Sequence, residues 1–350
     1  YDSPESPLLI NLDPDTLRSS PRDRIKPREL GPNRLRTTSQ ESPIDTRGPQ
    51  QDTNHPATTG PPAAIVTARD AVNLATEALK QSGITTSIGD AEIIVAHALG
   101  VGRSELQSGA SDAAALSAAQ VAQVTEFVQR RLRREPLQHL TGVSLFRQLE
   151  LAVGPGVFVP RRETEFVTQL AIDALRTSDS ANPIAVDLGT GAGAIALSMA
   201  TEVPASTVYG VEISAEAFKW TRRNFEKIAP ANSLAVLGDM TDALPDLDGT
   251  VDVVVGNPPF QPDGIESVTP EVRLFDPSVA LFGGGIDGLD LVRALSRRAL
   301  GLLKPAGTLA FEHGVSQSST IAALLGADGW TNVTSHRDPR GRERVTTARR

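Results

Sequence analysis

The chain has 350 residues and a mass of 37.0 kDa, which corresponds to two domains at ~150 residues each. The hydrophobic fraction of 39% is sufficient for a core, and the net charge of −8 gives no general attraction to nucleic acid or to an anionic membrane. The absence of cysteine excludes a disulfide framework, a thiolate nucleophile and a cysteine-bound metal site, and we expect no metal. Since neither an apolar run of ~18 residues nor a signal-peptide pattern occurs, we expect a cytoplasmic protein.

Residues 1–62 are expected to form a disordered extension. This stretch holds 11 of the 25 prolines, and its apolar residues follow no period. Such a segment cannot bury enough apolar surface to offset the entropy that is lost on ordering. We therefore expect the first folded domain to follow it.

Residues 63–136 are predicted to form a small helical domain. Apolar residues at spacings of three and four predict a first helix that begins after Thr67. Thr67 and Asp70 have the spacing of a capping box, in its weaker aspartate form. Two further helices are predicted over 90–99 and 117–134.

Residues 137–165 are predicted to be a connector that contains a β-hairpin, because apolar and polar residues alternate there. From 166 to 350, apolar strands alternate with helical patterns, which predicts an α/β fold with a mostly parallel seven-stranded sheet and helices on both faces. The expected strands are 184–188, 208–213, 234–238, 251–256, 308–312, 332–336 and 344–348. The expected helices are 194–201, 215–228, 289–303 and 318–325.

A glycine-rich turn follows the first of these strands, in the stretch Gly189-Thr190-Gly191-Ala192-Gly193. Glycines there permit a tight turn and a close approach of a ligand to the backbone. The spacing also fits the fingerprint of dinucleotide-binding proteins. Asp187, however, would bring a negative charge close to a pyrophosphate, whereas it suits a ligand with an ammonium group. We therefore favour S-adenosylmethionine over NAD.

Two further carboxylates end the next strands. Glu212 can accept hydrogen bonds from both ribose hydroxyls of an adenosine ligand, and Asp239 can accept one from the adenine amine while Met240 contacts the ring. Carboxylates at three successive strand ends after a glycine loop predict a nucleoside cofactor without phosphate. The predicted cofactor-binding residues are Asp187, Leu188, Gly189, Thr190, Gly191, Glu212, Asp239, Met240 and Asn257.

The fourth buried strand delivers Asn257-Pro258-Pro259-Phe260 to the same edge of the sheet. Two prolines restrict the backbone and remove N–H donors, so the Asn257 and Pro258 carbonyls present acceptors only. Two acceptors can take both protons of an amide nitrogen, favour its pyramidal form and direct its lone pair at a sulfonium methyl group for in-line displacement. We predict Asn257, Pro258 and Phe260 as catalytic residues, and Asn257 to Phe260 as the substrate-binding segment.

With these motifs, the sequence resembles the bacterial peptide chain release factor glutamine methyltransferases, a branch of the class I S-adenosylmethionine-dependent methyltransferases. The resemblance covers about residues 66–350. It implies a Rossmann-like methyltransferase domain preceded by a helical domain that recognises the substrate and by a hairpin. Its motifs are Pro136–Gly142, Gly156–Glu165, Val186–Gly191, Gly256–Phe260, Glu271–Pro277, Ala280–Gly284, Phe311–Gly314 and Arg342–Thr346.

The resemblance also implies a reaction, which is N5-methylation of the glutamine in the Gly-Gly-Gln loop of class 1 release factors. By matched position, Asn257 to Phe260 would hold that glutamine, and the cofactor site would be lined by Asp187 to Gly191, Glu212, Met240 and Asn257. The chain departs from the family pattern at Phe260, where a tyrosine is usual, and at Arg162, where a proline is usual. We expect a monomer whose partner is a release factor, with no direct contact to nucleic acid.

Other functions remain open at this point. The acceptor could be a glutamine of another protein, such as a ribosomal protein, or an exocyclic amino group of RNA or DNA, which poses the same lone-pair problem. The basic run Arg130–Arg134 could contact phosphate, although we interpret it as a solvated helix face. The change at Phe260 also leaves open a cofactor-binding scaffold without activity, and an NAD-dependent oxidoreductase is the weakest alternative.

Overall fold

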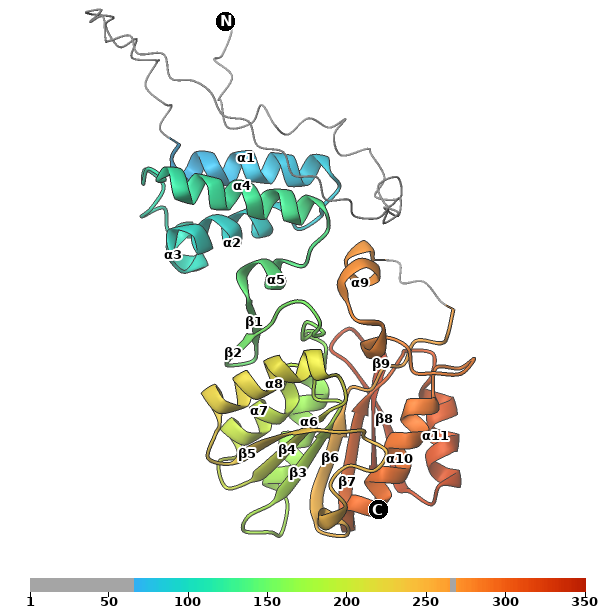
Figure 1. Ribbon diagram of the computed structural model, residues 1–350. Coiled ribbons are helices and arrows are strands. Elements are labelled where there is room, and N and C mark those ends of the chain that lie inside the picture. Colours follow the sequence, from blue (N-terminus) through green and yellow to red (C-terminus); the bar gives the residue numbers. More distant parts are fainter. Residues whose placement is uncertain (1–65, 265–268) are drawn as a thin grey trace, which may run out of the picture. The chain divides into compact units, whose positions relative to one another are not determined.

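The chain follows the predicted order of a helical segment, a hairpin and an α/β sheet (Figure 1). The computed structural model describes residues 66–264 and 269–350, so the predicted disordered extension over 1–62 lies outside the described residues. Residues Thr67–Arg350 form one compact unit. In the part of the chain that is described, no helix has the length and apolarity needed to cross a bilayer.

The helical segment contains the three predicted helices and two additional short ones. The capping box before the first helix is confirmed, because the Thr67 side chain accepts from the Asp70 N–H and the Asp70 carboxylate accepts from the Thr67 N–H. The short helices were not predicted, since a single turn is too short to show a period. The helices are α1 (Ala68–Gln81), α2 (Ser87–Leu99), α3 (Arg103–Gln107), α4 (Ala118–Leu132) and α5 (Leu137–Thr141).

The predicted hairpin consists of β1 (Val143–Phe146) and β2 (Leu149–Ala152), which pair antiparallel. The next element, α6 (Thr164–Arg176), was not predicted, and its first two residues fall in the predicted connector. Its apolar residues have helical spacing and are buried against the sheet, which explains why the helix forms: Val167, Ala171, Ile172 and Leu175.

The sheet has the predicted seven strands, in the order β5-β4-β3-β6-β7-β9-β8. All neighbours are parallel except that β9 runs antiparallel to both β7 and β8. The predicted boundaries hold within one or two residues except at β7, which begins five residues earlier. The strands are β3 (Ile184–Leu188), β4 (Thr207–Glu212), β5 (Ser233–Leu237), β6 (Val251–Gly256), β7 (Leu303–Glu312), β8 (Thr331–Arg337) and β9 (Glu343–Arg349).

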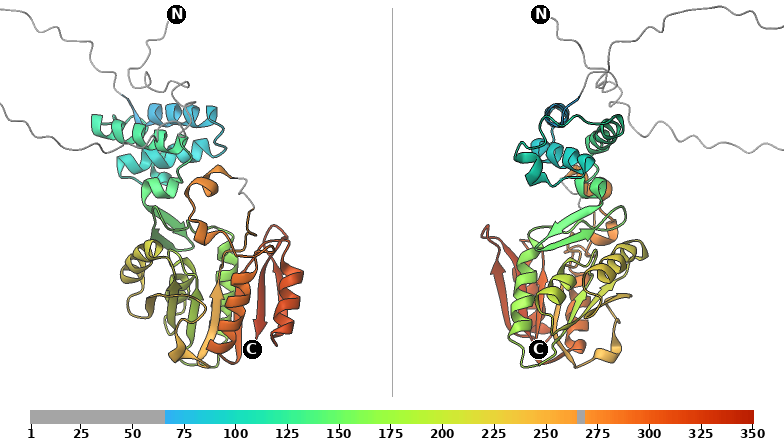
Figure 2. Two further views of the ribbon diagram at one scale, coloured as in Figure 1. Left: turned by 45° about the vertical axis from the view of Figure 1, so that its right-hand side comes forward. Right: turned by 90° about the vertical axis from the view of Figure 1, so that its left-hand side faces the viewer.

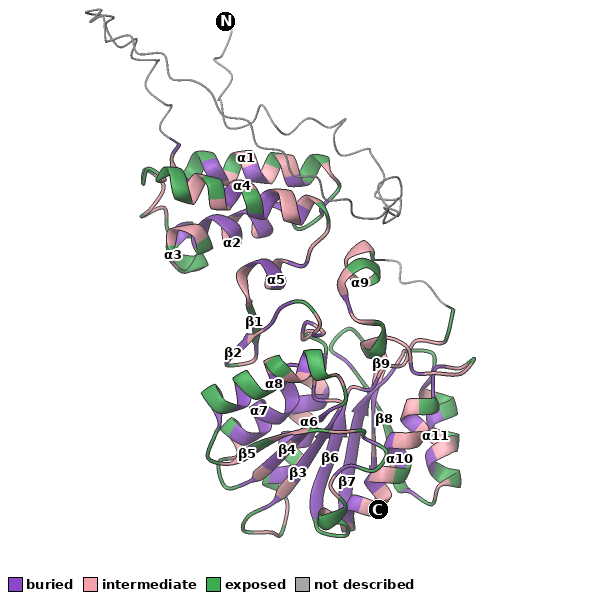
Figure 3. Ribbon diagram, viewed as in Figure 1, coloured by how far each residue is buried: buried purple, intermediate pink, exposed green. Residues whose placement is uncertain are grey.

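Helices cover both faces of the sheet (Figure 2). On one face α6, α7 and α8 pack against one set of strand residues, and on the other α10 and α11 pack against the alternate set. Both faces of the central strands are therefore buried, as Figure 3 shows in purple. The remaining helices are α7 (Ala194–Glu202), α8 (Ala215–Ile228), α9 (Pro270–Phe275), α10 (Asp290–Leu302) and α11 (Ser318–Ala327). Of these, α9 was not predicted.

The strand order determines where a ligand can bind. From β3 the chain proceeds through β4 to β5 on one side, and then returns to place β6 on the other side of β3. At such a reversal the loops that follow the two neighbouring strands diverge and open a crevice at the carboxyl ends of the strands. The glycine loop follows β3 and Asn257 follows β6, so both motifs border this crevice.

Candidate active site

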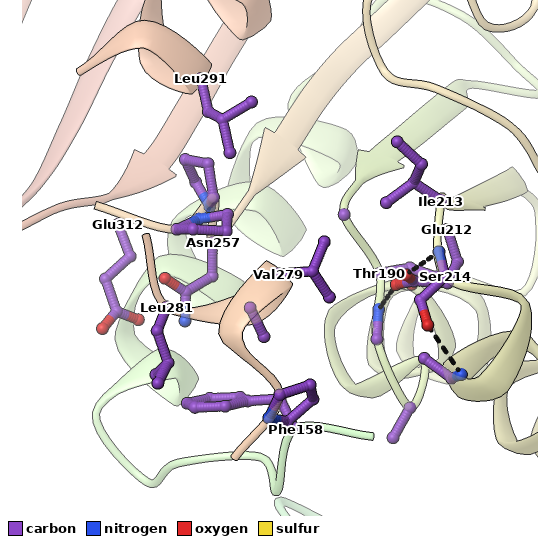
Figure 4. Close-up of a pocket in the computed structure, with 18 of the residues that line it drawn as sticks. Phe158, Thr190, Glu212, Ile213, Ser214, Asn257, Val279, Leu281, Leu291 and Glu312 are labelled. Carbon is purple, nitrogen blue, oxygen red and sulfur yellow. Dashed lines mark hydrogen bonds between the residues drawn. The ribbon is translucent and has the colours of Figure 1, made fainter. Parts of the chain in front are cut away.

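A cavity of about 370 Å³ lies at the carboxyl ends of the parallel strands. Its volume is within the range of roughly 300–1,000 Å³ that is usual for small-molecule sites. Figure 4 shows Glu212 and Ser214 on one side of it and Asn257 and Glu312 on the other. Of the predicted site residues, the lining includes Gly189, Thr190, Gly191, Glu212, Asp239, Met240, Asn257, Pro258, Pro259 and Phe260.

The glycine loop is held against β4 by its own backbone. The N–H groups of Gly189 and Thr190 both donate to the carbonyl of Val211, at 3.0 and 2.8 Å. Gly191 has a φ of +56°, which favours glycine. A Cβ built on it would have no atom within 4 Å, so the space beside its Cα is empty. The loop therefore exposes backbone to the cavity at a position that favours glycine.

Glu212 ends β4 and faces the cavity, as predicted. Its Oε2 accepts from the Gly191 N–H at 2.9 Å and its Oε1 accepts from the Ser214 N–H at 2.8 Å. Each carboxylate oxygen has a second lone pair, which remains for a hydroxyl donor. Because the side chain is buried, its pKa is raised despite these two bonds.

Asp187 differs from its predicted position, because it is fully buried and does not line the cavity. Its Oδ2 accepts from the Thr190 hydroxyl at 2.7 Å and from the Ala196 N–H at 3.2 Å, while Oδ1 has no partner. Burial raises its pKa to about 7. Asp187 thus supports the loop and the start of α7 from beneath. Leu188 is likewise fully buried and outside the lining.

Asp239 and Met240 line the cavity beyond β5. Asp239 is exposed, and its Oδ1 accepts from the Thr241 N–H at 2.8 Å. Met240 is buried, and its Cε would lie 3.6 Å from a Cβ built on Gly189. The thioether therefore lies beside the glycine loop, where it can contact a flat ring.

Asn257 lies directly after β6, and a close approach of backbones positions it. A Cβ on Gly256 would lie 2.7 Å from the carbonyl oxygen of Leu188, so only glycine fits there. The Nδ2 of Asn257 donates to the Thr164 hydroxyl at 3.2 Å. Within the described residues, neither Oδ1 of Asn257 nor the carbonyl of Pro258 receives a hydrogen bond from the protein. Two acceptors of this segment are thus free for a substrate.

Phe260 is held by Gln317, which no sequence motif indicated, and lies near Arg344 of the Arg342–Thr346 motif. The Gln317 side chain donates to the Phe260 carbonyl at 2.9 Å and accepts from the Gly314 N–H at 2.8 Å. The guanidinium of Arg344 lies 5.8 Å from the centre of the Phe260 ring. Arg162 is exposed, and nothing in the structure explains why it replaces the usual proline.

The basic run Arg130–Arg134 is not the solvated face that we predicted. Arg131 is buried, and its guanidinium donates to Asp90 at 2.7 Å and to Glu271 at 3.0 Å. Arg130 is paired with Glu135. Since Arg130, Arg131 and Arg134 are paired with carboxylates of the protein, little of the charge of the run remains for a phosphate, which weakens the nucleic-acid alternative.

The residues present fit S-adenosylmethionine. The cavity side of the glycine loop is open, and the carboxylates of Glu212 and Asp239 flank it at successive strand ends. These anions would repel a pyrophosphate, whereas they offer acceptors to a ribose and an adenine amine and tolerate a cationic ligand. Within the described residues, no group of three or more histidine, aspartate or glutamate side chains could hold a metal ion.

Comparison with known proteins agrees with this site. The family model described as PrmC N-terminal domain matches residues 70–142, and the model described as methyltransferase small domain matches residues 148–281. The second match includes the glycine loop, Glu212 and Asn257.

Three relatives cover most of this chain. The release factor glutamine methyltransferase of Streptomyces coelicolor is 48% identical over 280 residues, which are 79% of this chain and 95% of the relative. The protein of the same name from Bifidobacterium longum is 40% identical over 288 residues, 80% of this chain and 98% of the relative. The 4-amino-L-phenylalanine/4-methylamino-L-phenylalanine methyltransferase of Streptomyces pristinaespiralis is 38% identical over 279 residues, 78% of this chain and 92% of the relative.

The two family models together match residues 70–142 and 148–281, so the matches include the helical segment as well as the strands β3 to β6. Identity at this level over nearly the whole length of the relatives excludes a likeness of fold alone. The chain belongs to the release factor glutamine methyltransferases, a family of S-adenosylmethionine-dependent enzymes.

Proposed function

We propose that this protein methylates the side-chain nitrogen of the glutamine in the Gly-Gly-Gln loop of class 1 peptide chain release factors. The observation that carries the proposal is the placement of two free acceptors, Oδ1 of Asn257 and the Pro258 carbonyl, in one cavity with the glycine loop and Glu212. The identity of 48% to a release factor glutamine methyltransferase supports the choice of substrate.

The chemical difficulty is that an amide nitrogen has a delocalised lone pair. When bound, S-adenosylmethionine supplies an electrophilic methyl group. Asn257 and the Pro258 carbonyl accept the two amide protons and hold the nitrogen, while the Phe260 ring lies against the flat face of the amide. Glu212, Asp239 and the open backbone of the glycine loop hold the nucleoside. Orientation and fixed dipoles perform most of the work, and no strong base is needed before the new bond forms.

The test is methyl transfer from a labelled cofactor to a purified release factor, followed by mass spectrometry of the Gly-Gly-Gln peptide. We expect one added methyl group on that glutamine. A release factor with this glutamine changed to alanine is the control. Label on a ribosomal protein or on rRNA instead, in parallel reactions, would overturn the choice of substrate but not the chemistry.

A second acceptor is included in the same assay. A relative named for methylating 4-amino-L-phenylalanine is 38% identical to this chain, and an aniline nitrogen has a delocalised lone pair like that of an amide. Free 4-amino-L-phenylalanine is therefore added as a competing substrate. We expect the release factor to be preferred, and turnover of the free amino acid alone would favour the second function.

Asn257→Ala separates the roles of the motif. We expect turnover to fall far more than cofactor affinity, because the change removes an acceptor for the substrate nitrogen and leaves the nucleoside contacts in place. Turnover is measured with the labelled cofactor and affinity by calorimetry. A variant with ordinary kcat would contradict the role of Asn257.

The organisation of the whole chain is part of the proposal. We assign residues 63–136 to substrate recognition, 137–165 to a connector and 166–350 to methyl transfer, with 1–62 as an extension. Because release factors act on cytoplasmic ribosomes, the proposed substrate implies a cytoplasmic enzyme. We further propose a monomer, and sedimentation equilibrium is expected to give a mass near 37.0 kDa.

A further inference from the structure

The amide of Asn257 is held by a buried chain of hydrogen bonds. Its Nδ2 donates to Thr164 Oγ1 at 3.2 Å, and Thr164 Oγ1 donates to Glu312 Oε2 at 2.8 Å. Thr164 is 4% exposed and Glu312 is 3% exposed. The three residues come from the start of α6, the position directly after β6 and the end of β7, so tertiary structure alone brings them together.

The direction of these hydrogen bonds follows from the donors that each group has. An ionised carboxylate can only accept, and a threonine hydroxyl has one proton. Since that proton is donated to Glu312, the Thr164 oxygen can only accept from Asn257. A reversed Asn257 amide would bring two buried acceptors together without a proton between them, which is unfavourable. The NH₂ group of Asn257 must therefore face Thr164, and its carbonyl oxygen must face away.

We propose that Thr164 and Glu312 are positioning residues that fix the orientation of the Asn257 amide, so that Oδ1 is presented to the nitrogen of the substrate. This inference rests on the proposed function, in which Asn257 accepts a proton of the substrate amide. It assigns a task to the Thr164 of the Gly156–Glu165 motif and to the Glu312 of the Phe311–Gly314 motif, neither of which the mechanism above uses.

The cations near Glu312 lower its pKa, but they do not outweigh the effect of burial. The nearest cation is Arg344 of β9, whose Nη2 lies 3.9 Å from Oε1 and 3.5 Å from Glu163. Arg342 directly precedes the same strand, and both arginines act to lower the pKa of Glu312, whereas Glu163 acts to raise it. Burial outweighs the arginines, so the pKa is raised above the usual range of a glutamate.

This setting predicts an effect of pH. A protonated Glu312 can donate to Thr164, which frees the Thr164 hydroxyl to donate to Oδ1 and removes the preference between the two amide orientations. Activity is therefore expected to fall as the pH decreases through the raised pKa of Glu312. In Glu312→Gln the side chain offers a donor and an acceptor at every pH, so kcat is expected to be low and this acid limb to be absent.

The decisive variants act on Thr164. Thr164→Val keeps the shape and removes the hydroxyl, and we expect kcat to fall by about 100-fold, the scale of a misplaced catalytic group, with an unchanged Kd for the cofactor. Thr164→Ser restores the hydroxyl and is expected to recover most of the kcat. Thr168→Val is the matched control, because Thr168 is a fully buried threonine on the same helix whose hydroxyl bonds only to a backbone carbonyl.

A second readout does not depend on the methyl acceptor. The side-chain NH₂ signals of Asn257, assigned with Asn257→Ala, are followed by nitrogen–proton NMR. We expect slow solvent exchange in the wild-type protein and faster exchange in Thr164→Val. If the wild type fails to methylate a release factor but shows this difference, the proposed function falls and the positioning role stands. Unchanged exchange and unchanged kcat in a folded Thr164→Val protein would overturn the inference.

Discussion

Three carboxyl groups at or beneath the cavity are buried, and neutral groups donate all the hydrogen bonds found to them. Asp187 accepts from a hydroxyl and an N–H, Glu212 from two N–H groups, and Glu312 from a hydroxyl. Neutral donors replace only part of the lost hydration, so the pKa of each carboxyl group is raised. A cationic ligand in the cavity would therefore stabilise the ionised forms of these groups and lower their pKa values.

Asp187 gives a prediction for stability. Its pKa of about 7 in the folded protein lies above the 3.8 that is ordinary for an aspartate, so its contribution to stability is present at low pH and is lost as the pH rises through about 7. Asp187→Asn removes this titration. From pH 4 to pH 7 we expect the wild type to lose stability relative to the variant, by on the order of 4 kcal/mol at most.

The measurement is urea unfolding at several pH values in that window. The exposed Asp246, changed to asparagine, is the control. A stability difference between the wild type and Asp187→Asn that stays constant with pH would refute the prediction.

Glu212 gives a prediction for binding. Glu212→Ala removes the acceptor for the ribose hydroxyls, and we expect cofactor binding to weaken by ~1.5–3 kcal/mol, the scale of hydrogen bonds to a charged group. Calorimetry gives the Kd, with the exposed Glu226 on α8 changed to alanine as the control. An unchanged Kd would argue against the ribose role.

At the scale of the elements, Asn224 of α8 connects the hairpin to the glycine loop. Its Oδ1 accepts from the Ala152 N–H at 2.8 Å, and its Nδ2 donates to the carbonyls of Ala152 and Ala192 at 2.9 and 2.8 Å. Ala152 ends β2 and Ala192 belongs to the glycine loop. A single fully buried amide thus fixes the connector and the cofactor loop to one helix.

Asn224→Ala tests this connection. The change leaves buried backbone groups without partners, and we expect a loss of ~1–3 kcal/mol in the free energy of unfolding, together with weaker cofactor binding. Chemical denaturation and calorimetry measure the two effects. The neighbouring exposed Arg223 changed to alanine should show neither, and a variant with wild-type stability would contradict the prediction.

At the scale of the molecule, an ion-pair cluster joins the helical segment to the wall of the cavity. Arg131 of α4 pairs with the buried Asp90 of α2 and with Glu271 of α9, and Arg134 lies 3.6 Å from Glu271. Val272, the next residue of α9, lines the cavity. The helical segment therefore holds the cavity wall through Glu271, which supports its proposed part in substrate recognition.

Glu271→Gln should weaken the contact between α9 and the helical segment and leave the residues that contact the nucleoside unchanged. We expect KM for the release factor to rise by up to about 5-fold, the size of one partly exposed ion pair, with an unchanged Kd for the cofactor. Steady-state kinetics and calorimetry test this. Glu126→Gln is the control, because it removes an exposed ion pair with Arg130 within α4, the helix that also carries Arg131. An equal rise in KM in both variants would exclude a specific role of Glu271.

The amino-acid sequence alone was sufficient to derive the succession of strands, the glycine loop, the Asn257–Phe260 segment and the class of cofactor. Strands β3 and β6 are short, mostly apolar segments that lead into glycine, and such signals are local, as is the capping box at Thr67. The helix α9 was missed, because it spans only six residues and Glu271 in it finds its partners more than a hundred positions away.

The folded structure was needed for everything that depends on contact across the chain. Asp187 looks like a ligand-facing carboxylate in sequence, but its side chain turns beneath the loop because the hydroxyl of Thr190 and the N–H of Ala196 lie there. Arg131 looks solvated and is buried by partners from other elements. The chain from Asn257 through Thr164 to Glu312 joins three distant segments. Hydrogen bonds and burial at such distances follow from packing, which no local pattern encodes.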